Sequence, residues 1–373
     1  MAEAKRVLLL YITDRSGHHS AALAIKRGLE LKDRRVLVSC VNAFQYVFPV
    51  AERLIHRLYL AVIKKAPKIW EFIYDNPRVV KSSDYLKGKI YNLGINRLKR
   101  LLDEFRPDVV ACTQAFPCGL VAGYKERFKV RLPLVGVLTD FAPHAFWVAE
   151  AVDQYVVPCE ESRGLLVEKG VAFKKIKTLG IPIDPKFIDR LDRQELVANY
   201  GLTADVSVVL IMGGGHGLGP ITQTLKNLDQ AKQDLQMVVV CGLNKKLFDW
   251  IQRHPFKKRI LSFKFTDQVD RLMSVASVII TKPGGITTAE ALAKRIPMII
   301  LNPIPGQEAR NTALLTKNKA AVKVDQVADV LPTIEKLLSQ QKTFAGMSVF
   351  NPLAEYSKPH SALDIASMLL SLC

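Results

Sequence analysis

The 373-residue sequence lacks several features that would assign it to a specialised class of protein. No apolar run approaches the roughly 18 residues that a membrane-spanning helix needs. The first apolar stretch ends at Thr13, Asp14 and Arg15, as a strand would and a signal peptide would not. The six cysteines include no C-x-x-C pair, which excludes a zinc or disulfide framework and favours a reducing compartment. We therefore expect a cytoplasmic protein.

Several motifs of catalysis and binding are absent as well. The chain has no Asp-x-Asp, the pair that holds the metal in many nucleotide-sugar transferases with a single sheet domain. It has no G-x-S-x-G and no acid–histidine metal pattern. A paired-cysteine finger, an aromatic ribonucleoprotein motif and a basic zipper are also missing. These absences predict a protein that uses no metal and no cofactor and that binds no nucleic acid.

Acidic residues are scarce, and the resulting net charge of +18 is unevenly spread. Residues 44–106 contain 13 Lys or Arg against 6 Asp or Glu, together with 10 of the 29 aromatic residues. Basic and aromatic side chains interleaved in this way suit an anionic surface, and we favour bilayer headgroups over nucleic acid. The alternative is a solvated basic helical face. We expect a helical insertion, 44–106, that contacts the inner face of the cell membrane.

Short β-branched runs alternate with helical patterns along the chain, which predicts parallel βαβ architecture. The expected strands are 6–12, 35–41, 108–112, 134–139, 154–157 and 177–178, then 206–212, 236–241, 260–263, 278–281, 298–301 and 321–323. Residues 1–185 and 186–350 thus form two doubly wound α/β domains facing each other across a cleft. Ligands of such domains bind outside the carboxyl ends of the strands. The terminal segment 351–373, helical over 351–370, is expected to pack back on the first domain.

Glycine-rich turns mark the second half. Thr281-Lys-Pro-Gly-Gly-Ile-Thr-Thr follows an expected strand and opens a helix, so free backbone N–H groups and the positive helix end converge on an anion. Met212-Gly-Gly-Gly-His-Gly-Leu-Gly is a second turn suited to phosphate. Between the last two expected strands, Gln307, Glu308 and Asn311 offer polar groups to sugar hydroxyls. A diphosphate beside a hydroxyl-rich group indicates a nucleotide sugar.

One carboxylate and one histidine complete the candidate chemistry. Glu290 lies one turn into the helix that starts at Gly285, where it would bind a ribose diol or simply complement the helix dipole. Gly17 and His18 follow the first strand, where the histidine would take a proton from a hydroxyl near neutral pH or merely cap the helix. The sequence alone leaves both pairs of interpretations open.

A second cluster of candidates lies at the end of the fourth expected strand. Asp140 would orient or replace a histidine base, or cap the turn. His144 and Trp147 follow it and would meet an acceptor, although a tryptophan here also suits a core or a membrane interface.

Taken together, these motifs resemble those of the monogalactosyldiacylglycerol synthase and processive diacylglycerol glucosyltransferase family, distant relatives of the peptidoglycan N-acetylglucosaminyltransferase. The first half supplies Ser-Gly-His-x-x-Ala-Ala at 16–22, Thr-Asp-x-x-x-His-x-x-Trp at 139–147 and Gly-Ile-Pro at 180–182. The second half supplies Met-Gly-Gly-Gly-x-Gly at 212–217, Cys-Gly-x-Asn at 241–244, Thr-Lys-Pro-Gly-Gly-x-Thr at 281–287 and Pro-Ile-Pro-Gly-Gln-Glu-x-x-Asn at 303–311. The motifs occur in the family order and cover nearly the whole chain.

The resemblance implies a GT-B fold and transfer of glucose or galactose from a UDP-sugar to a diacylglycerol hydroxyl, with inversion to a β-glycoside. It implies that His18 is the general base or an acceptor-site histidine. It places Gly214, Gly215, Thr287 and Thr288 near the diphosphate, and Asn244 and Phe265 near the uracil. The insertion 44–106 corresponds to the part of the family that reaches the bilayer, but its own sequence matches no motif closely, so the acceptor lipid stays open.

Other functions fit the same residues. A transferase with a polyprenyl-linked acceptor or a soluble aglycone would keep the donor site, and a UDP-sugar epimerase would use two similar domains. A non-catalytic protein that only senses a nucleotide sugar would have the same binding residues. The sequence does not choose between glucose and galactose, because the pair Gln307 and Glu308 would hold either sugar.

Overall fold

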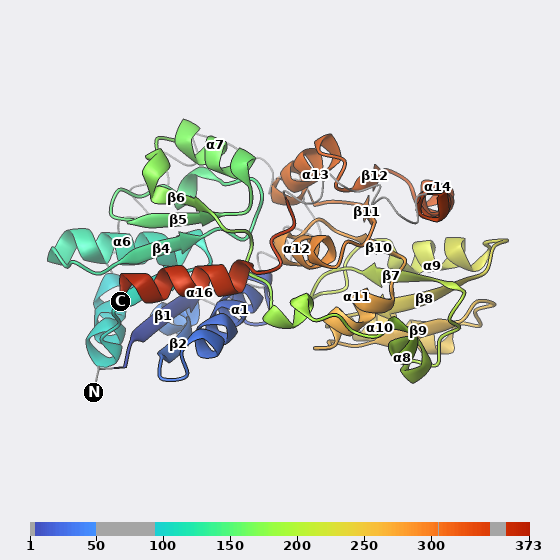
Figure 1. Cartoon of the computed structure of the whole chain (residues 1–373), viewed down its shortest axis with the longest axis horizontal. Helices are drawn as coiled ribbons and strands as arrows, with labels where there is room; N and C mark the ends of the chain where they lie inside the picture. The colour runs from blue at the N-terminus through green and yellow to red at the C-terminus, as the bar shows by residue number, and fades with distance from the viewer. Residues whose placement is uncertain (1–3, 50–93, 305, 344–355) are drawn as a thin grey trace. The chain divides into compact units, whose positions relative to one another are not determined.

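The computed structural model of the chain describes residues 4–49, 94–304, 306–343 and 356–373. These residues belong to two units, each with its own six-stranded parallel sheet (Figure 1). The first unit comprises Met1–Pro185, Ile304–Gln307 and Lys358–Cys373, and the second comprises Lys186–Pro303 and Glu308–Ser357. The short 3-10 helix η3 (Pro185–Ile188) spans the first change of unit.

The sheet of the first unit has the strand order β2-β1-β3-β4-β5-β6, and all neighbours run parallel. Its strands are β1 (Arg6–Tyr11), β2 (Leu37–Asn42), β3 (Val109–Cys112), β4 (Leu134–Val137), β5 (Gln154–Val157) and β6 (Ile176–Thr178). The order changes direction at β1, because β2 lies on one side of it and every later strand lies on the other. Such a switch point leaves a crevice at the carboxyl ends of the two central strands, here β1 and β3.

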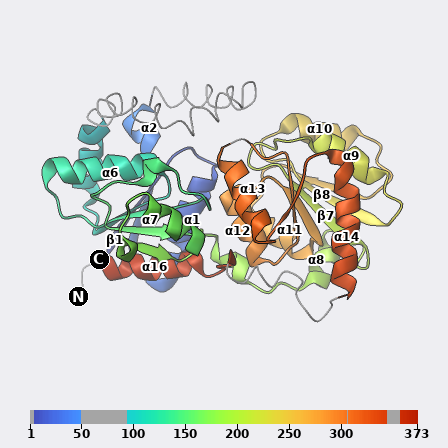
Figure 2. The ribbon, with the colours of Figure 1, turned by 90° about the horizontal axis from the view of Figure 1, so that it is seen from above.

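Side chains of β1 alternate between two cores, one on each face of this sheet. Leu8 and Leu10 join a cluster with α6 (Ala115–Phe128), whereas Val7 and Leu9 join a cluster with α1 (Gly17–Lys32) and α16 (Ser361–Leu372). Figure 2 shows α6 and α16 on opposite sides of the sheet. A strand that is buried on both faces needs a continuous apolar run, which explains why these strands are recognisable in the sequence. The helices are α1 (Gly17–Lys32), α2 (Ala43–Val47), residues 94–105, α6 (Ala115–Phe128), α7 (Glu160–Glu168) and α16 (Ser361–Leu372), with 3-10 turns η1 (Ala145–Trp147) and η2 (Phe173–Lys175).

The C-terminal helix α16 lies against α1 in the first unit (Figure 1). A Cβ atom on Gly28 of α1 would lie 2.6 Å from the carbonyl oxygen of Ala362, so glycine is what lets the two helices approach so closely. Residues 357–360 are not helical, and the expected continuous helix over 351–370 is wrong at this point. Pro359 explains the break, because proline has no N–H and its ring clashes with the preceding helical turn. Residues 351–355 of that expectation lie outside the described residues.

The sheet of the second unit repeats the same plan, with the order β12-β11-β10-β7-β8-β9 and parallel neighbours throughout. Its strands are β7 (Ser207–Met212), β8 (Leu235–Val240), β9 (Ile260–Phe263), β10 (Val278–Thr281), β11 (Met298–Leu301) and β12 (Val322–Val324). The chain proceeds outward from β7 to β9 and then returns to the other side of β7 as β10. The switch point therefore lies between β7 and β10.

Both faces of this second sheet are covered. Val209 and Ile211 join a core with α9, α10 and α14, while Val208 and Leu210 point to the opposite face and are completely buried as well. The helices are α8 (Arg193–Asn199), α9 (Ile221–Asp229), α10 (Lys245–Arg253), α11 (Val269–Val275), α12 (Gly285–Ala293), α13 (Gln307–Lys317) and α14 (Val330–Thr343), with the 3-10 turn η4 (Val327–Asp329).

The α/β class predicted from the sequence is confirmed, and each of the twelve expected strands is present within two residues of its expected limits. Of the expected insertion 44–106, residues 50–93 lie outside the described part of the chain. Among the helices that the structure describes, none is long and apolar enough to cross a membrane.

Candidate functional site

In the first unit, the switch point joins the residues that follow β1 to those that follow β3. His18 is the second residue of α1, whose N-cap is Ser16, and Thr113 comes directly after β3. The Thr113 hydroxyl donates a hydrogen bond of 2.8 Å to the backbone carbonyl of His18. The parallel pairing of β1 and β3 brings these two segments together although 95 residues separate them in the chain.

The imidazole of His18 is held in one tautomer. Its Nδ1 lies 3.0 Å from the backbone carbonyl oxygen of Thr113 and 2.9 Å from Oγ1 of Thr139. Because a carbonyl oxygen can only accept, the contact with Thr113 assigns the proton to Nδ1. The second ring nitrogen, Nε2, then carries a lone pair and can accept a proton from a ligand.

Electrostatics keeps His18 uncharged. Burial lowers the pKa of His18 from its ordinary value to about 4, and the hydrogen bond to the Thr113 carbonyl opposes this shift only in part. The imidazole is therefore neutral across the physiological range of pH, so it is in the form of a base. The same shift makes it a weak base.

The loop between β1 and α1 is held by a network of its own. The rings of Tyr11 and His19 are stacked with centroids 4.3 Å apart, and the Tyr11 hydroxyl donates to Asp14 at 2.8 Å. The backbone N–H of Arg15 donates to Nδ1 of His19 at 3.2 Å. Thr13 and Arg15 both have positive φ, 61° and 58°, which is unfavourable for residues with a side chain. This loop is a strained connection that fixes where α1, and with it Gly17 and His18, begins.

The segment after β4 contributes Thr139 to the surroundings of His18 and buries the side chain of Trp147. Thr139 contacts His18 Nδ1, and the neighbouring Asp140 is 9 % exposed. His144 is half-buried, with ring contacts to Phe146 and Trp147. Trp147 is only 3 % exposed and belongs to a hydrophobic core of the first unit, which agrees with the core alternative for this residue.

In the second unit, the glycine-rich turn after β7 packs against the turn after β8. A Cβ atom on Gly217 would lie 2.3 Å from the carbonyl oxygen of Cys241, and one on Gly242 would lie 2.4 Å from that of Gly215. Gly214 has φ of 69°, and nothing lies within 4 Å of the place its Cβ would occupy. Glycine is thus required at two positions by close packing and at Gly214 by its conformation, and Gly214 exposes its backbone to open space.

Asn244 holds this pair of turns in place. Its Nδ2 donates to the carbonyl oxygen of Gly217 at 3.0 Å, and its Oδ1 accepts from the backbone N–H of Leu247 as the N-cap of α10. Both the nitrogen and the oxygen of the Asn244 amide therefore bond to the protein's own backbone, and they hold the glycine-rich turn in position. Phe265, two residues beyond β9, is 52 % exposed.

The first turn of α12 follows β10. Its N-cap is Gly284, which has no side chain to bond the first N–H groups of the helix, and a Cβ there would meet nothing within 4 Å. Thr288 is completely buried, and its hydroxyl has no hydrogen-bond partner among the described residues. Gly285 is buried, whereas Thr287 and Glu290 are half-buried. No side chain of the N-cap occupies this helix start, which is the arrangement that would suit the anion site predicted from the sequence.

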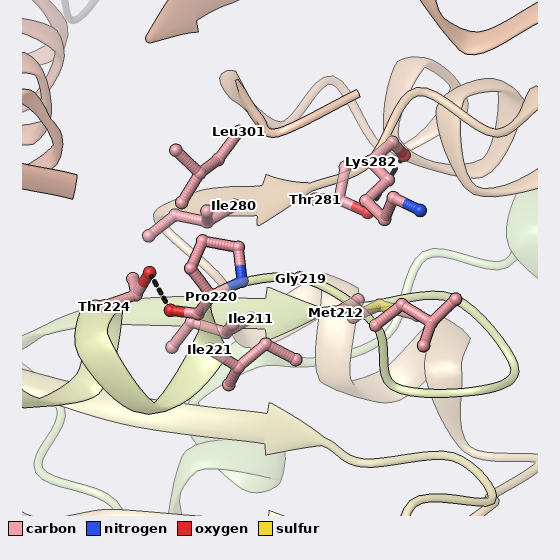
Figure 3. Close-up of a pocket in the computed structure, with 11 residues that line it drawn as sticks. Ile211, Met212, Gly219, Pro220, Ile221, Thr224, Ile280, Thr281, Lys282 and Leu301 are labelled. Atoms are coloured by element: carbon pink, nitrogen blue, oxygen red, sulfur yellow. Dashed lines mark hydrogen bonds between the residues drawn. The ribbon is translucent and has the colours of Figure 1, made fainter. Parts of the chain in front are cut away.

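A buried lysine completes the arrangement of the second unit. Lys282 is 8 % exposed, and its Nζ lies 3.4 Å from Oε2 of Glu308, on α13. Asn311, also on α13, donates from Nδ2 to the carbonyl oxygen of Pro283 at 3.0 Å, which ties α13 to the turn before α12. Figure 3 shows Lys282 beyond the carboxyl end of β10, across from the turn that contains Gly219. A small pocket at the switch point is lined by Met212, Gly219, Thr281 and Lys282 among others.

The structure groups the predicted residues into two sets. At the first switch point lie Gly17 and His18, and at the second lie the glycine turn, the start of α12, and Glu308 with Asn311 on α13. Gln307 is the first residue of α13. Sequence reasoning missed Thr113, Thr139 and Lys282. Within the described residues, no three His, Cys, Asp or Glu side chains are grouped closely enough to hold a metal ion.

Comparison with known proteins gives two family matches and several relatives. The family model of monogalactosyldiacylglycerol (MGDG) synthase matches residues 18–183, and that of the glycosyltransferase family 28 C-terminal domain matches residues 208–353. A processive diacylglycerol beta-glucosyltransferase of Bacillus licheniformis is 32 % identical over 344 residues, which cover 91 % of this chain and 88 % of that protein.

Solved structures of lower identity share the fold. The UDP-GlcNAc 2-epimerase from Neisseria meningitidis aligns with a TM-score of 0.62 and 15 % identity over 98 % of this chain and 100 % of that one. MurG from Acinetobacter baumannii aligns with a TM-score of 0.60 and 13 % identity over 98 % and 99 % of the two chains. The predicted GT-B fold is thereby confirmed. The chain belongs to the family of the monogalactosyldiacylglycerol synthases and processive diacylglycerol beta-glucosyltransferases.

Proposed function

We propose that the protein transfers glucose or galactose from a UDP-sugar to the free hydroxyl of 1,2-diacylglycerol, with inversion and without a metal. The names of its relatives support a glycosyltransferase that acts on diacylglycerol. The observation that carries the proposal is the contact between His18 and Thr113 at the first switch point. It leaves a neutral imidazole with its unprotonated nitrogen available, as a base for an acceptor hydroxyl requires.

In the proposed reaction, Nε2 of His18 accepts the proton of the acceptor hydroxyl. As it does so, the hydroxyl oxygen forms a bond to the anomeric carbon on the face opposite UDP, and the bond from that carbon to the diphosphate breaks with its electron pair going to the diphosphate. A single displacement of this kind inverts the configuration and gives a β-glycolipid. Asp140 assists or replaces His18 in this proposal, since it is adjacent to Thr139, which contacts the imidazole.

The second unit would hold the donor. The open helix start at Gly285 and the backbone of Gly214 and Gly215 supply N–H groups to the diphosphate, where charge grows as the sugar leaves. Glu290 would bind the ribose, and Phe265 would stack on the uracil. Gln307 and Glu308 stand at the start of α13, where they would meet the sugar hydroxyls, whereas Asn311 is completely buried and bonded to the Pro283 carbonyl, so it would hold α13 in position instead of contacting the sugar.

The acceptor places the reaction at a lipid surface. We propose that the protein is cytoplasmic and binds peripherally to the inner face of the cell membrane through the basic aromatic insertion 44–106. Its net charge of +18 supports attraction to anionic headgroups. His144 would face the acceptor lipid, next to the exposed Phe146.

The test is incubation of the purified protein with UDP-glucose, UDP-galactose or UDP-N-acetylglucosamine and vesicles that contain diacylglycerol, with the glycolipid read by mass spectrometry. We expect a hexosyl-diacylglycerol from one of the first two donors. His18→Gln should abolish transfer while UDP binding persists, and His360→Gln is the matched control because His360 is exposed and makes no side-chain capping bond.

The same assay separates the other candidate functions. An epimerase would convert the donor sugar in the absence of any lipid, and a transferase with another acceptor would leave diacylglycerol unchanged while consuming donor with polyprenyl phosphate. A sensor would bind UDP-sugar without turnover of either substrate. Near-normal transfer by the His18→Gln variant would refute the assignment of the base but would leave the proposed transferase activity standing.

A further inference from the structure

Lys282 is an unusual residue for the interior of the second unit. Its side chain is only 9 % exposed, and a buried ammonium is costly unless acceptors surround it. Its three N–H donors have one acceptor, Oε2 of Glu308 at 3.4 Å, among the residues that the structure describes. Burial lowers the pKa of Lys282, and the Glu308 carboxylate offsets this shift only in part. The cation is therefore incompletely paired.

The position of Lys282 indicates which kind of ligand could supply the acceptors that its ammonium group lacks. It lies at the switch point between β7 and β10, where it lines the pocket together with Gly219 and Thr281 (Figure 3). Two residues further along the chain is Gly284, the N-cap of α12, which has no side chain to occupy the helix start. Lysine and the open start of α12 thus belong to one short segment, and both favour an anion.

The surrounding contacts fix this segment without using the ammonium. The Gly284 N–H donates to the carbonyl oxygen of Lys282 at 2.8 Å, and Asn311 holds the carbonyl oxygen of Pro283. The turn would therefore keep its shape if the lysine changed partner. To bind another anion, the ammonium group would have to give up one ion pair among the described residues, that with Glu308.

We propose that Lys282 binds the diphosphate of the nucleotide-sugar donor, and that Glu308 holds the ammonium only until the donor arrives. This inference rests on the proposed function, because it names a diphosphate as the ligand. Phosphate oxygens supply the acceptors that the ammonium lacks, and the exchange releases the carboxylate of Glu308 toward the sugar hydroxyls. As the bond from the anomeric carbon to the diphosphate breaks, the lysine also neutralises the charge that develops on UDP.

The experiment compares the binding of UDP, UMP and uridine by isothermal titration calorimetry. For Lys282→Gln we expect UDP affinity to fall roughly 10- to 100-fold, the range of a lost charge-assisted hydrogen bond, with uridine affinity within about twofold of wild type. Lys282→Arg keeps the charge and should keep most of the UDP affinity. Lys294→Gln is the matched control, because burial lowers the pKa of Lys294 too, yet its Nζ bonds the carbonyl oxygen of Asp189 away from the pocket.

Glu308→Gln tests the exchange itself. Removing the carboxylate leaves the ammonium uncompensated, so UDP should bind several-fold more tightly while transfer of the sugar becomes slower. Weaker binding of UDP by this variant would overturn the exchange of partners.

The outcomes separate the inference from the proposed function. If wild-type protein binds UDP and Lys282→Gln binds it equally well, the role of the lysine is refuted and the proposed function stands. An equal loss of UDP and uridine affinity would also refute it, since that pattern reports a damaged fold. If wild-type protein binds no UDP at millimolar concentration, the proposed function fails and the inference fails with it.

Discussion

The pH dependence of the proposed transfer is a direct consequence of how His18 is held. Burial lowers the pKa of His18 to about 4, so the base loses its activity only when the pH falls through that value. At pH 5.5, roughly 97 % of such a histidine is neutral, whereas an ordinary histidine of pKa about 6.5 would be roughly 9 % neutral. The value of kcat/KM at pH 5.5 should therefore stay close to that at pH 7.5, instead of dropping about tenfold.

The assay is the initial rate of glycolipid formation at low substrate concentration between pH 4.5 and 8, on vesicles of phosphatidylcholine and diacylglycerol. The charge of phosphatidylcholine does not change in this range, so the profile reports the protein and its donor. A separate measurement needs no activity: in an NMR titration of labelled histidines, the His18 resonance, assigned by its loss in His18→Gln, should not shift above pH 5. An acid limb centred near pH 6.5, or a His18 resonance that titrates there, would refute the reasoning.

Four further predictions concern the packing of the two units, the proposed donor site and the proposed membrane contact. Gly28→Ala should lower the free energy of unfolding by about 1–3 kcal/mol, because its Cβ would lie 2.6 Å from the Ala362 carbonyl oxygen, while the control Gly164→Ala in α7 has open space and should not destabilise; thermal unfolding checks both. Asn244→Ala should cost about 1–2 kcal/mol, since it removes the N-cap of α10 and the bond to Gly217, and a melting temperature equal to that of wild type would contradict this. Glu290→Ala should weaken UDP binding roughly 10- to 100-fold through loss of the ribose contact, and unchanged affinity in calorimetry would exclude that role. In liposome flotation the protein should bind vesicles with anionic lipid and lose that binding as salt is raised, whereas indifference to lipid charge would refute the membrane role proposed for 44–106.

The elements of this fold were predictable because both sheets are parallel and covered on both faces. Their strands are continuous apolar runs, such as Val208 to Met212, which stand out from the amphipathic helices between them. The helix 351–370 was predicted without a break, but residues 357–360 are not helical, because Pro359 interrupts the helical hydrogen bonding. For Trp147 the sequence left an acceptor contact, a core position and a membrane interface open, because the direction of a side chain in a 3-10 turn is set by tertiary packing.

Two different physical effects explain why Thr113 and Lys282 could not be identified from the sequence. Thr113 contacts the imidazole through its backbone carbonyl, which every residue type possesses, so the residue type does not reveal this contact. It can be found only from the strand order, which brings β3 next to β1. Lys282 was hidden by a different effect, because a lysine beside glycine and proline resembles a solvated turn until its burial is known. Its partner Glu308 was identified, but as a ligand of the sugar and not as the counter-ion that it is in this structure.

The low pKa of His18 also limits the order of events in the proposed reaction. An aliphatic hydroxyl has a pKa near that of water, about 16, so its complete deprotonation by a base of pKa about 4 would cost about 16 kcal/mol. That cost alone equals the whole barrier of an enzyme that turns over on the order of ten times per second. The hydroxyl therefore cannot be ionised before it attacks. Its proton must move to His18 as the bond to the anomeric carbon forms, when the oxygen becomes acidic, and the imidazolium must form while charge is growing on the departing diphosphate.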